Sequence, residues 1–185
     1  MLEQVKQFVQ QSFDQGINDK CTKHFEQTLY WVKQLKPDAD EPVLIAAYAH
    51  DTARAFRTQN TEETFKNKEF NDPEILKEHQ YEGASMVSDF LNKEGYDEES
   101  IKRVFNMIGH HEEGGDAESN LVMDADSISY LEIIAIRHIE LSNSLGKEKI
   151  KRKIDWMYKR VSSDKAKALA TPYYKKAIIS FLKYK

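Results

Sequence analysis

Residues 42–56, PVLIAAYAHDTARAF, place a histidine and an aspartate directly after an apolar run. Residues 42–49 carry no polar side chain except the hydroxyl of Tyr48, so the run predicts a helix buried in the protein core. Burying an unpaired carboxylate and imidazole costs several kcal/mol. A divalent cation removes that cost, because it makes the carboxylate and the neutral imidazole the favoured forms. The pair His50-Asp51 therefore indicates a metal site within a helical core.

The composition is that of an ordinary globular protein. The chain has 185 residues, of which 40% are hydrophobic and 31% charged, enough for one domain with a sizeable core. Its net charge of -4 gives no general attraction to nucleic acid or anionic lipid. We therefore expect neither a nucleic-acid polymer nor a membrane as partner; the chain is expected to be a monomer or homodimer, and the small phosphorylated substrate expected as its partner is implied only by the resemblance described below.

Three further observations predict a cytoplasmic protein. Cys21 is the only cysteine, which excludes an intrachain disulfide and fits a reducing compartment. The N-terminal residues 1–15 are charged and amphipathic, unlike a secretory signal. No apolar stretch approaches the ~18 residues that a membrane span requires.

Helical periodicity dominates the chain and no alternating strand pattern is visible, so we predict an all-α fold. A single domain is expected over residues 1–185, with the motifs in about 20–140 and C-terminal helices in about 147–185. Residues 57–71 are polar and aperiodic, which predicts a loop or lid. The predicted helices cover about residues 3–14 (ended by Gly16), 19–36, 40–56, 72–93 and 98–109, a segment from Ser119 or Asn120 to Leu145, and two or three tail helices, the last beginning at Thr171-Pro172.

Imidazoles and carboxylates recur at other helical positions. Taken singly, each has a simpler interpretation, such as a hydrogen-bonded helix residue or a C-terminal cap favoured by the helix dipole. Gly83 and Ala84, which follow one of these histidines, would let a neighbouring helix pack closely. Together the positions favour a metal centre. Outside the His50-Asp51 pair they are His24, His79, His110, His111, Asp124 and Asp126.

The order of these residues resembles the HD-domain superfamily of metal-dependent phosphohydrolases, whose minimal signature is a His, a His-Asp pair and a distal Asp. The segment HQYEGA (79–84) is similar to the HxxxGA segment of binuclear members, and GHHEE (109–113) to the turn that supplies their next ligand. In DADSISYL (124–131) the residue after alanine corresponds to the usual ligand. This favours Asp126, with Asp124 as second choice or outer partner.

The resemblance implies an enzyme that hydrolyses phosphoester or phosphoanhydride bonds. We expect a phosphomonoesterase or phosphodiesterase that acts on a nucleotide-like or other small phosphorylated substrate through a metal-bound hydroxide. Two divalent transition-metal ions are implied, and Fe, Mn, Co, Ni or Zn would suit imidazole and carboxylate ligands. Asp51 would bridge them, and the remaining ligands would be His24, His50 and Asp126 at one ion and His79 with His110 or His111 at the other.

Arg54 is grouped with His50 and Asp51 as a candidate catalytic residue. It lies nearly one helical turn beyond Asp51, so its guanidinium could meet a phosphate oxygen, although a surface salt bridge is an equal alternative. Arg57 and Lys66 are weaker candidates for substrate contact.

Four other polar residues near the motifs have less definite interpretations. Glu112 and Glu113 could orient water, but a solvated turn is favoured. Tyr130 could line a pocket or pack in the core, and His138 stands apart from the pattern as a structural residue.

Two departures restrict the resemblance. The Gly-Tyr-Pro extension of cyclic-dinucleotide phosphodiesterases is absent, and the chain is shorter than the elaborated deoxynucleotide triphosphohydrolases. Small binuclear hydrolases, including those that split symmetrical dinucleoside polyphosphates, are the most similar group. The same ligand order also resembles di-iron oxygenases of this fold, which would be coloured and consume oxygen. A non-catalytic ligand sensor is a third alternative, but it would lack ligands, and none is missing from the pattern.

Overall fold

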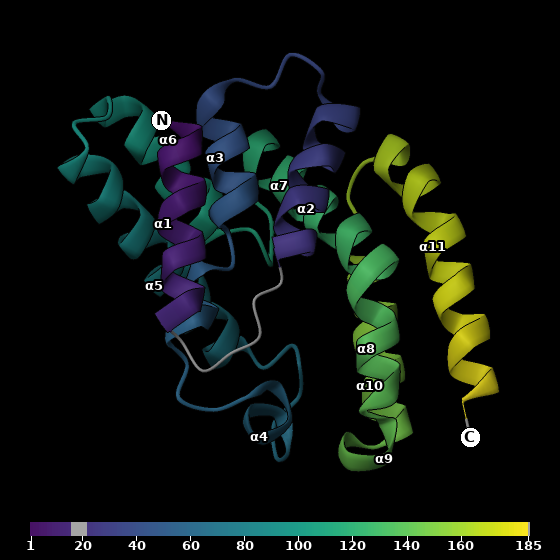
Figure 1. The fold of residues 1–185 in the computed structure, drawn as a ribbon. Coiled ribbons are helices and arrows are strands. Elements are labelled where there is room, and N and C mark those ends of the chain that lie inside the picture. Colours follow the sequence, from purple (N-terminus) through teal and green to yellow (C-terminus); the bar gives the residue numbers. More distant parts are fainter. Residues whose placement is uncertain (16–21, 185) are drawn as a thin grey trace.

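The protein is all-α, as predicted. The computed structural model describes residues 1–15 and 22–184, and within these ranges every regular element is a helix (Figure 1). The helices, in chain order, are α1 (Leu2–Gln15), α2 (Thr22–Leu35), α3 (Glu41–Ala49), the 3-10 helix η1 (Thr52–Phe56), α4 (Thr61–Phe65), α5 (Pro73–Lys93), α6 (Glu98–Gly109), α7 (Ala117–Ser129), the π-helix η2 (Tyr130–Ile134), α8 (Ala135–Glu140), α9 (Ser142–Leu145), α10 (Lys147–Lys159) and α11 (Asp164–Lys183).

Helix α3 forms the centre of the N-terminal part of the fold. It packs against α1, α2, α6 and α7, and every side chain from Ile45 to Ala49 is fully buried. The small side chains of Ala46, Ala47 and Ala49 let these neighbours approach closely, and the apolar surface removed from water stabilises the arrangement. The prediction of a buried helix ahead of the His-Asp pair is confirmed.

The His-Asp pair lies at a break in the chain rather than within one continuous helix over residues 40–56. Helix α3 ends at Ala49, His50 is its C-cap, and Asp51 precedes η1 with φ -100° and ψ 14°. Helix α5 packs against this break at Gly83, where a Cβ atom would lie 3.3 Å from the carbonyl oxygen of His50. Gly83 therefore allows the close approach that the sequence predicted.

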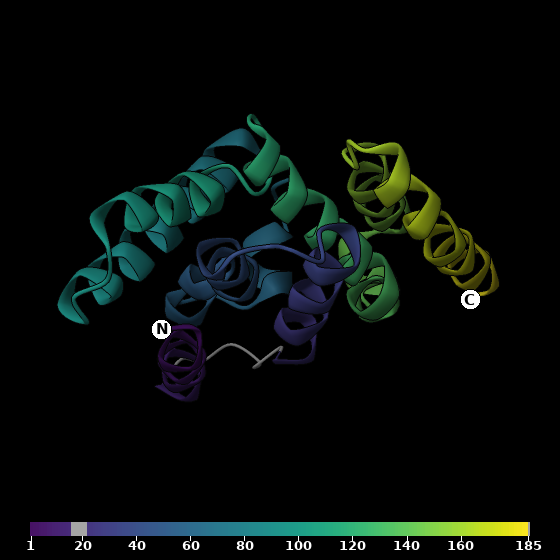
Figure 2. The ribbon, with the colours of Figure 1, turned by 90° about the horizontal axis from the view of Figure 1, so that it is seen from above.

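The C-terminal helices form a second group beside the first (Figure 2). Helix α10 packs against α8, α11 and η2, while α11 also packs against α7. Helix α7 and η2 therefore connect the group around α3 to the C-terminal helices. As a result, residues of α10, η2 and α8 line one cavity.

Several predicted boundaries were wrong for identifiable reasons. Helix α7 begins at Ala117, before Ser119 or Asn120, because the side chain of Asp116 caps it by accepting from the Ser119 amide. The last helix begins at Asp164 behind the cap residue Ser163, and Pro172 lies inside it.

The segments 57–71 and 120–145 also differ from their predictions. Residues 57–71 are not wholly a loop, because Asn60 and Glu63 form a capping box that starts α4. The predicted long helix to Leu145 is divided into α7, η2, α8 and α9, and the tail forms two helices, α10 and α11. The predictions at Gly16 and Asp19 lie outside the described residues, as does Cys21.

None of the helices in the described ranges combines the length and apolar character that crossing a membrane demands.

Candidate metal centre and adjoining cavity

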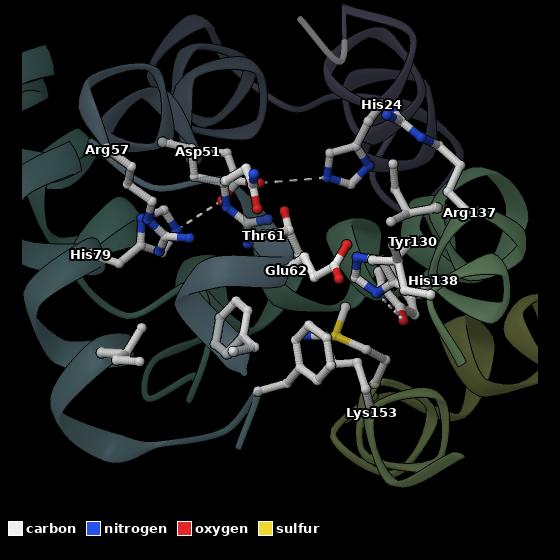
Figure 3. A pocket seen from close by; sticks show the side chains of 18 of the residues that line it. His24, Asp51, Arg57, Thr61, Glu62, His79, Tyr130, Arg137, His138 and Lys153 are labelled. Atoms are coloured by element: carbon white, nitrogen blue, oxygen red, sulfur yellow. Dashed lines mark hydrogen bonds and ion pairs between the residues drawn. The ribbon is translucent and has the colours of Figure 1, made fainter. Parts of the chain in front are cut away.

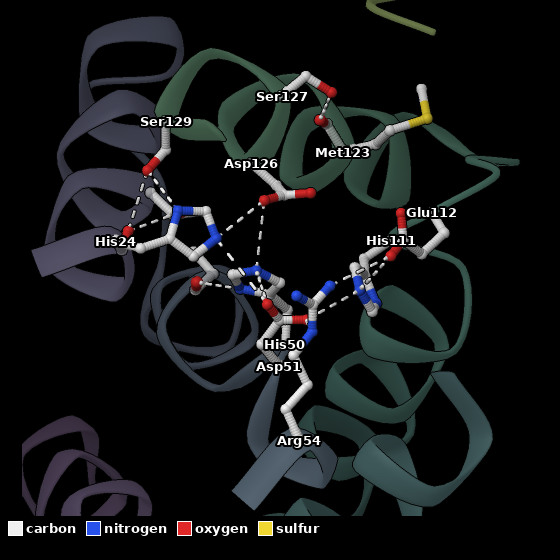
Figure 4. A network of polar contacts seen from close by, with 12 residues as sticks. His24, His50, Asp51, Arg54, His111, Glu112, Met123, Asp126, Ser127 and Ser129 are labelled. Carbon is white, nitrogen blue, oxygen red and sulfur yellow. Dashed lines mark hydrogen bonds and ion pairs between the residues drawn. The ribbon is translucent and has the colours of Figure 1, made fainter. Parts of the chain in front are cut away.

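Buried imidazoles and carboxylates from five parts of the chain converge on one centre (Figure 4). Around Asp126 on α7, Oδ1 lies 3.1 Å from His24 Nε2 and 3.4 Å from His50 Nε2. Around Asp51, Oδ1 lies 2.8 Å from His79 Nε2 and 3.7 Å from His111 Nε2. Each of these residues is at most 5% exposed.

The centre contains two overlapping sets of potential metal ligands. His24, His50 and Asp51 form one set, and Asp51, His79 and His111 form the other, with ligand atoms within 4.8 Å of one another in each. Asp51 belongs to both sets, which is compatible with the predicted bridging role. Asp126 is adjacent to the first set through His24 and His50.

The hydrogen bonds fix the tautomer of three of these rings. His50 Nδ1 lies 2.9 Å from the carbonyl oxygen of Ala47, and His111 Nδ1 lies 2.7 Å from that of Ile108, so both Nδ1 atoms donate. Ser129 donates its hydroxyl proton to the carbonyl oxygen of His24, so its oxygen accepts from His24 Nδ1 at 2.7 Å. The lone pair at Nε2 of each ring therefore points into the centre, as metal-bound histidines require.

Some buried ring nitrogens of the centre have no hydrogen-bond partner among the described residues. They are His50 Nε2, His111 Nε2 and His79 Nδ1. An unsatisfied buried polar atom costs about 1–3 kcal/mol. A divalent cation would satisfy the two Nε2 lone pairs and the neighbouring carboxylates together. The donor set, of imidazole nitrogen and carboxylate oxygen, thus fits a divalent transition metal.

The sequence did not decide between His110 and His111, or fully between Asp124 and Asp126, as metal ligands. The structure shows which residue of each pair reaches the centre. His110 is exposed and its Nδ1 bonds to the carbonyl oxygen of Asn106, because α6 ends at Gly109 and the chain turns there. His110 is therefore not brought to the centre, unlike His111. Asp124 is buried but accepts from the amides of Ser162 and Ser163 at 2.6 and 3.1 Å, so it holds the turn before α11.

Arg54 forms an ion pair with the buried Asp51, which differs from the surface salt bridge that was one of its two interpretations. Its Nε lies 2.8 Å from Asp51 Oδ1, and its side chain is 39% exposed toward the cavity. Burial would raise the pKa of the Asp51 carboxyl, but its polar neighbours, above all the charge of Arg54, hold that pKa well below its usual range. Asp51 is thus ionised at neutral pH, and Arg54 is still placed to meet an anion.

Sequence reasoning missed Arg160 and misjudged Glu112. Glu112 is only 3% exposed, so the expected solvated turn is wrong for it, whereas Glu113 is exposed. Arg160, at the C-terminal end of α10, donates to the carboxylates of Glu112 and Asp126 and to Ser127 Oγ. Burial raises the pKa of Glu112, but Arg160 and Lys153 outweigh it and lower that pKa to about 2. No local motif around Arg160 signals this contact.

A cavity of about 440 Å³ adjoins the centre (Figure 3). His24, Asp51, His79 and Asp126 contribute to its wall, so the candidate ligands are open to a small molecule. Lys66 does not line it. Other lining residues carry positive charge or a polar ring, namely Arg54, Arg57, Tyr130, Arg137, His138 and Lys153.

Tyr130 and His138 meet at this cavity. Tyr130 is buried and lines the cavity, so both of its predicted roles apply. His138, expected to be structural, also lines the cavity, with its Nδ1 2.9 Å from the Tyr130 hydroxyl and its ring stacked on Phe70. Tyr130 begins the π-helix η2, a distortion that is common at functional sites.

The comparisons with known proteins agree with this description. The HD domain family model matches residues 22–131, while no curated protein matches the chain. A similar solved structure is the 1.45 Å crystal structure of a predicted HD superfamily hydrolase from an uncultured Thermotogales bacterium, with a TM-score of 0.59 and 17% identity. The similarity covers 98% of this chain and 89% of that one, and shows a shared fold. Because the family model matches more than half of its residues, the chain belongs to the HD-domain family.

Proposed function

We propose that the protein is a metal-dependent hydrolase that cleaves a phosphoester or phosphoanhydride bond of a small phosphorylated substrate. The observation that carries the proposal is the set of Nε2 lone pairs of His24, His50 and His111, held toward the carboxylates of Asp51 and Asp126. The solved structure of similar fold is described as a predicted hydrolase, which supports the same reaction class.

The proposed ligands divide between two positions. His24, His50 and Asp126 would hold one ion, and His79 with His111 the other, with Asp51 shared by both. Divalent ions in such a centre lower the pKa of bound water and polarise a phosphoryl oxygen. Fe, Mn, Co, Ni and Zn all suit these ligands.

The chain's own residues would bind and orient the substrate. The Nε of Arg54 pairs with Asp51, and the Nη groups of the same guanidinium would donate hydrogen bonds to a phosphoryl oxygen. Glu112 Oε1 lies 3.8 Å from His111 Nε2. A carboxyl pKa of about 2 makes Glu112 a hydrogen-bond acceptor for water but too weak a base to retain a proton at neutral pH.

The cavity supports a small anionic substrate. A volume of about 440 Å³ lies in the range of small-molecule sites. The whole chain has a charge of -4, and both acidic and basic residues line this cavity, with Arg54 next to the metal centre. Arg54, together with divalent metal at the centre, would offset the repulsion between an acidic protein and a phosphorylated compound. We propose a nucleotide-like or other small phosphorylated metabolite.

The test begins with the full chain purified without chelator. Metal analysis should find bound transition metal, and a panel of phosphorylated metabolites should release phosphate or a phosphorylated product in its presence. Asp51→Asn should lose both the metal and the activity. A wild-type protein that binds no transition metal would contradict the proposal. Coloured iron with oxygen consumption, and no hydrolysis, would instead identify an oxygenase.

A further inference from the structure

Lys153 is a buried cation that the proposed chemistry at the metal centre does not use. It belongs to α10, outside the residues that the family model matches, and its side chain is 7% exposed. Its Nζ lies 4.3 Å from the ring centroid of Trp156, 5.4 Å from that of Tyr130 and 5.8 Å from that of Phe70. The ammonium group is thus enclosed by aromatic rings and lines the cavity.

The charge of Lys153 is not neutralised by an ion pair. Among the residues that the structure describes, no carboxylate oxygen lies within 4 Å of its Nζ and no acceptor forms a hydrogen bond with it. Two other lysines of α10 do have partners. Lys151 pairs with Asp155 at 2.7 Å, and Lys149 donates to the carbonyl oxygen of Phe65 at 2.8 Å.

This lone buried ammonium is costly to the folded protein. Burial is the largest effect and lowers the pKa of Lys153 to about 7, although Glu112 acts in the opposite direction. Glu112 and Asp126 are both already bound by Arg160. Of the other acidic residues of the cavity wall, Asp51 is paired with Arg54, and Glu62 and Glu140 are exposed and make no ion pair with Lys153. An anion that entered the cavity would supply the missing partner.

Lys153 is on a different side of the cavity from the metal ligands. Figure 3 shows Lys153 together with Tyr130 and His138, while Asp51 and His79 lie across the cavity from them. His138 lines the same side as Lys153, whereas the side chain of Arg137 lies beside His24 (Figure 3). Burial, together with the charges of Lys153 and Arg54, lowers the pKa of His138 to about 3, so its neutral ring can donate or accept a hydrogen bond.

We propose that Lys153, with His138 on the same side of the cavity, forms a second anion-binding position in the cavity. It would bind a negatively charged group of the substrate other than the phosphoryl group attacked at the metal centre. This inference rests on the proposed function and narrows its substrate class to small molecules with two separated acidic groups. The second group is a phosphate or a carboxylate, which share the acceptor oxygens that an ammonium requires.

The test uses phosphonates, because their P–C bond resists hydrolysis. The metal-loaded full chain is titrated calorimetrically with alkyl phosphonates, α,ω-alkane bisphosphonates and ω-carboxyalkyl phosphonates of matched chain length. At one chain length a doubly acidic compound should bind about tenfold more tightly than the matched alkyl phosphonate. The bisphosphonate and carboxylate arms distinguish the two kinds of second group. Metal retention is measured after each titration.

Variants then locate the gain in affinity. Lys153→Met should abolish it and leave the affinity for the alkyl phosphonate unchanged, while Lys153→Arg should retain part of it. Lys151→Met removes the same charge from the same helix outside the cavity and should retain all of it. The inference is overturned if no doubly acidic compound gains affinity in the wild type. It is equally overturned if Lys153→Met weakens both classes alike.

The same titrations separate this inference from the proposed function. Alkyl phosphonate binding that needs the metal and is lost in Asp51→Asn supports the metal centre, whether or not a second position exists. If the alkyl phosphonate does not bind but a doubly acidic compound does, and only with Lys153 present, the anion position stands while the proposed hydrolytic centre fails.

Discussion

The guanidinium of Arg160 donates to Oδ2 of Asp126 and leaves Oδ1 of the same carboxylate facing the imidazoles of the centre. Its other Nη group donates to Glu112, and its Cζ lies 4.7 Å from the ring centroid of Trp156. Arg160 is almost wholly buried, with its side chain 6% exposed. A residue from beyond the family match thus orients a proposed metal ligand.

Replacing Arg160 should weaken metal binding. Arg160→Gln would free Asp126 to rotate and leave Glu112 without its main counter-charge, and loss of such outer contacts lowers metal affinity by about 10–100-fold. Loss of one partner from a buried ion pair should also lower the free energy of unfolding by about 3–5 kcal/mol. Metal titration and chemical denaturation measure the two effects.

Two further variants make the Arg160 result interpretable. Arg160→Lys keeps the charge and should have an intermediate metal affinity. Arg152→Gln removes a more exposed arginine of α10, which pairs with Glu69, and should change little. An Arg160→Gln protein that folds and binds metal as tightly as the wild type would remove Arg160 from the positioning role.

The sequence was sufficient for the fold class and for the residues that converge. His50 and Asp51 could be selected because they follow an apolar helical run, whereas the joint pattern and the resemblance to the HD-domain family selected His24, His79 and Asp126. Such information is local, since a helix presents its side chains with a fixed period. The same reasoning predicted that Gly83 admits a neighbouring helix.

The residues that sequence reasoning missed depend on tertiary packing. Arg160 and Lys153 belong to an amphipathic, lysine-rich helix, where a basic residue is ordinarily a solvated surface residue. Only the packing of α10 against its neighbouring helices brings Lys153 to the cavity and Arg160 to Asp126. The choice between His110 and His111 similarly depends on the turn after Gly109, whose direction no periodic pattern predicts.

The adjacent histidines His110 and His111 provide a matched pair for testing the ligand assignment. His111→Ala removes the buried Nε2 atom that would bind the metal. The variant should bind one ion fewer, or bind metal at least ~100-fold more weakly. His110→Ala removes an exposed ring whose Nδ1 bonds only to a backbone carbonyl, so metal content should not change. Metal-to-protein ratios measured on both variants check this. The assignment is reversed if His110→Ala is the variant that loses metal.

Gly83 should be sensitive to the addition of a single methyl group. In Gly83→Ala the new Cβ would lie 3.3 Å from the carbonyl oxygen of His50 and 3.5 Å from Ile108 Cγ2, so the backbone of the His-Asp pair must shift. Overpacking of this kind costs about 1–3 kcal/mol, which exceeds the gain of about 1 kcal/mol in helix propensity. We expect a net loss of stability together with weaker metal binding.

Gly109→Ala is the control for the helix-propensity gain. Gly109 is the last residue of α6, and nothing lies within 4 Å of a Cβ built there. The substitution should stabilise the protein by up to about 1 kcal/mol and leave its metal affinity unchanged. Urea denaturation and metal titration of both variants check the pair. A Gly83→Ala protein as stable and as metal-avid as Gly109→Ala would show that the close approach at His50 tolerates a methyl group.

Lys153 should make the stability of the protein depend on pH in the alkaline range. Its pKa is about 7 in the folded protein because of burial, against 10.5 for an ordinary lysine. Between these pH values the unfolded chain binds a proton that the folded protein does not, so the wild-type free energy of unfolding should rise with pH. Each pH unit contributes up to about 1.4 kcal/mol.

Lys153→Met removes this dependence and keeps an unbranched side chain of similar length in the aromatic enclosure. The variant should be more stable than the wild type at pH 7, by on the order of 3–5 kcal/mol, because no lysine has to be deprotonated or buried as a cation. The difference in free energy of unfolding between the variant and the wild type should shrink toward pH 10, because Lys153 is then largely deprotonated in the unfolded chain as well. Denaturation curves of the two proteins and of Lys151→Met between pH 7 and 10 measure the differences. Lys151 is paired and half-exposed, so its variant should run parallel to the wild type. If the Lys153→Met curve is parallel as well, the ammonium of Lys153 is not destabilising and already has a counter-charge in the folded protein.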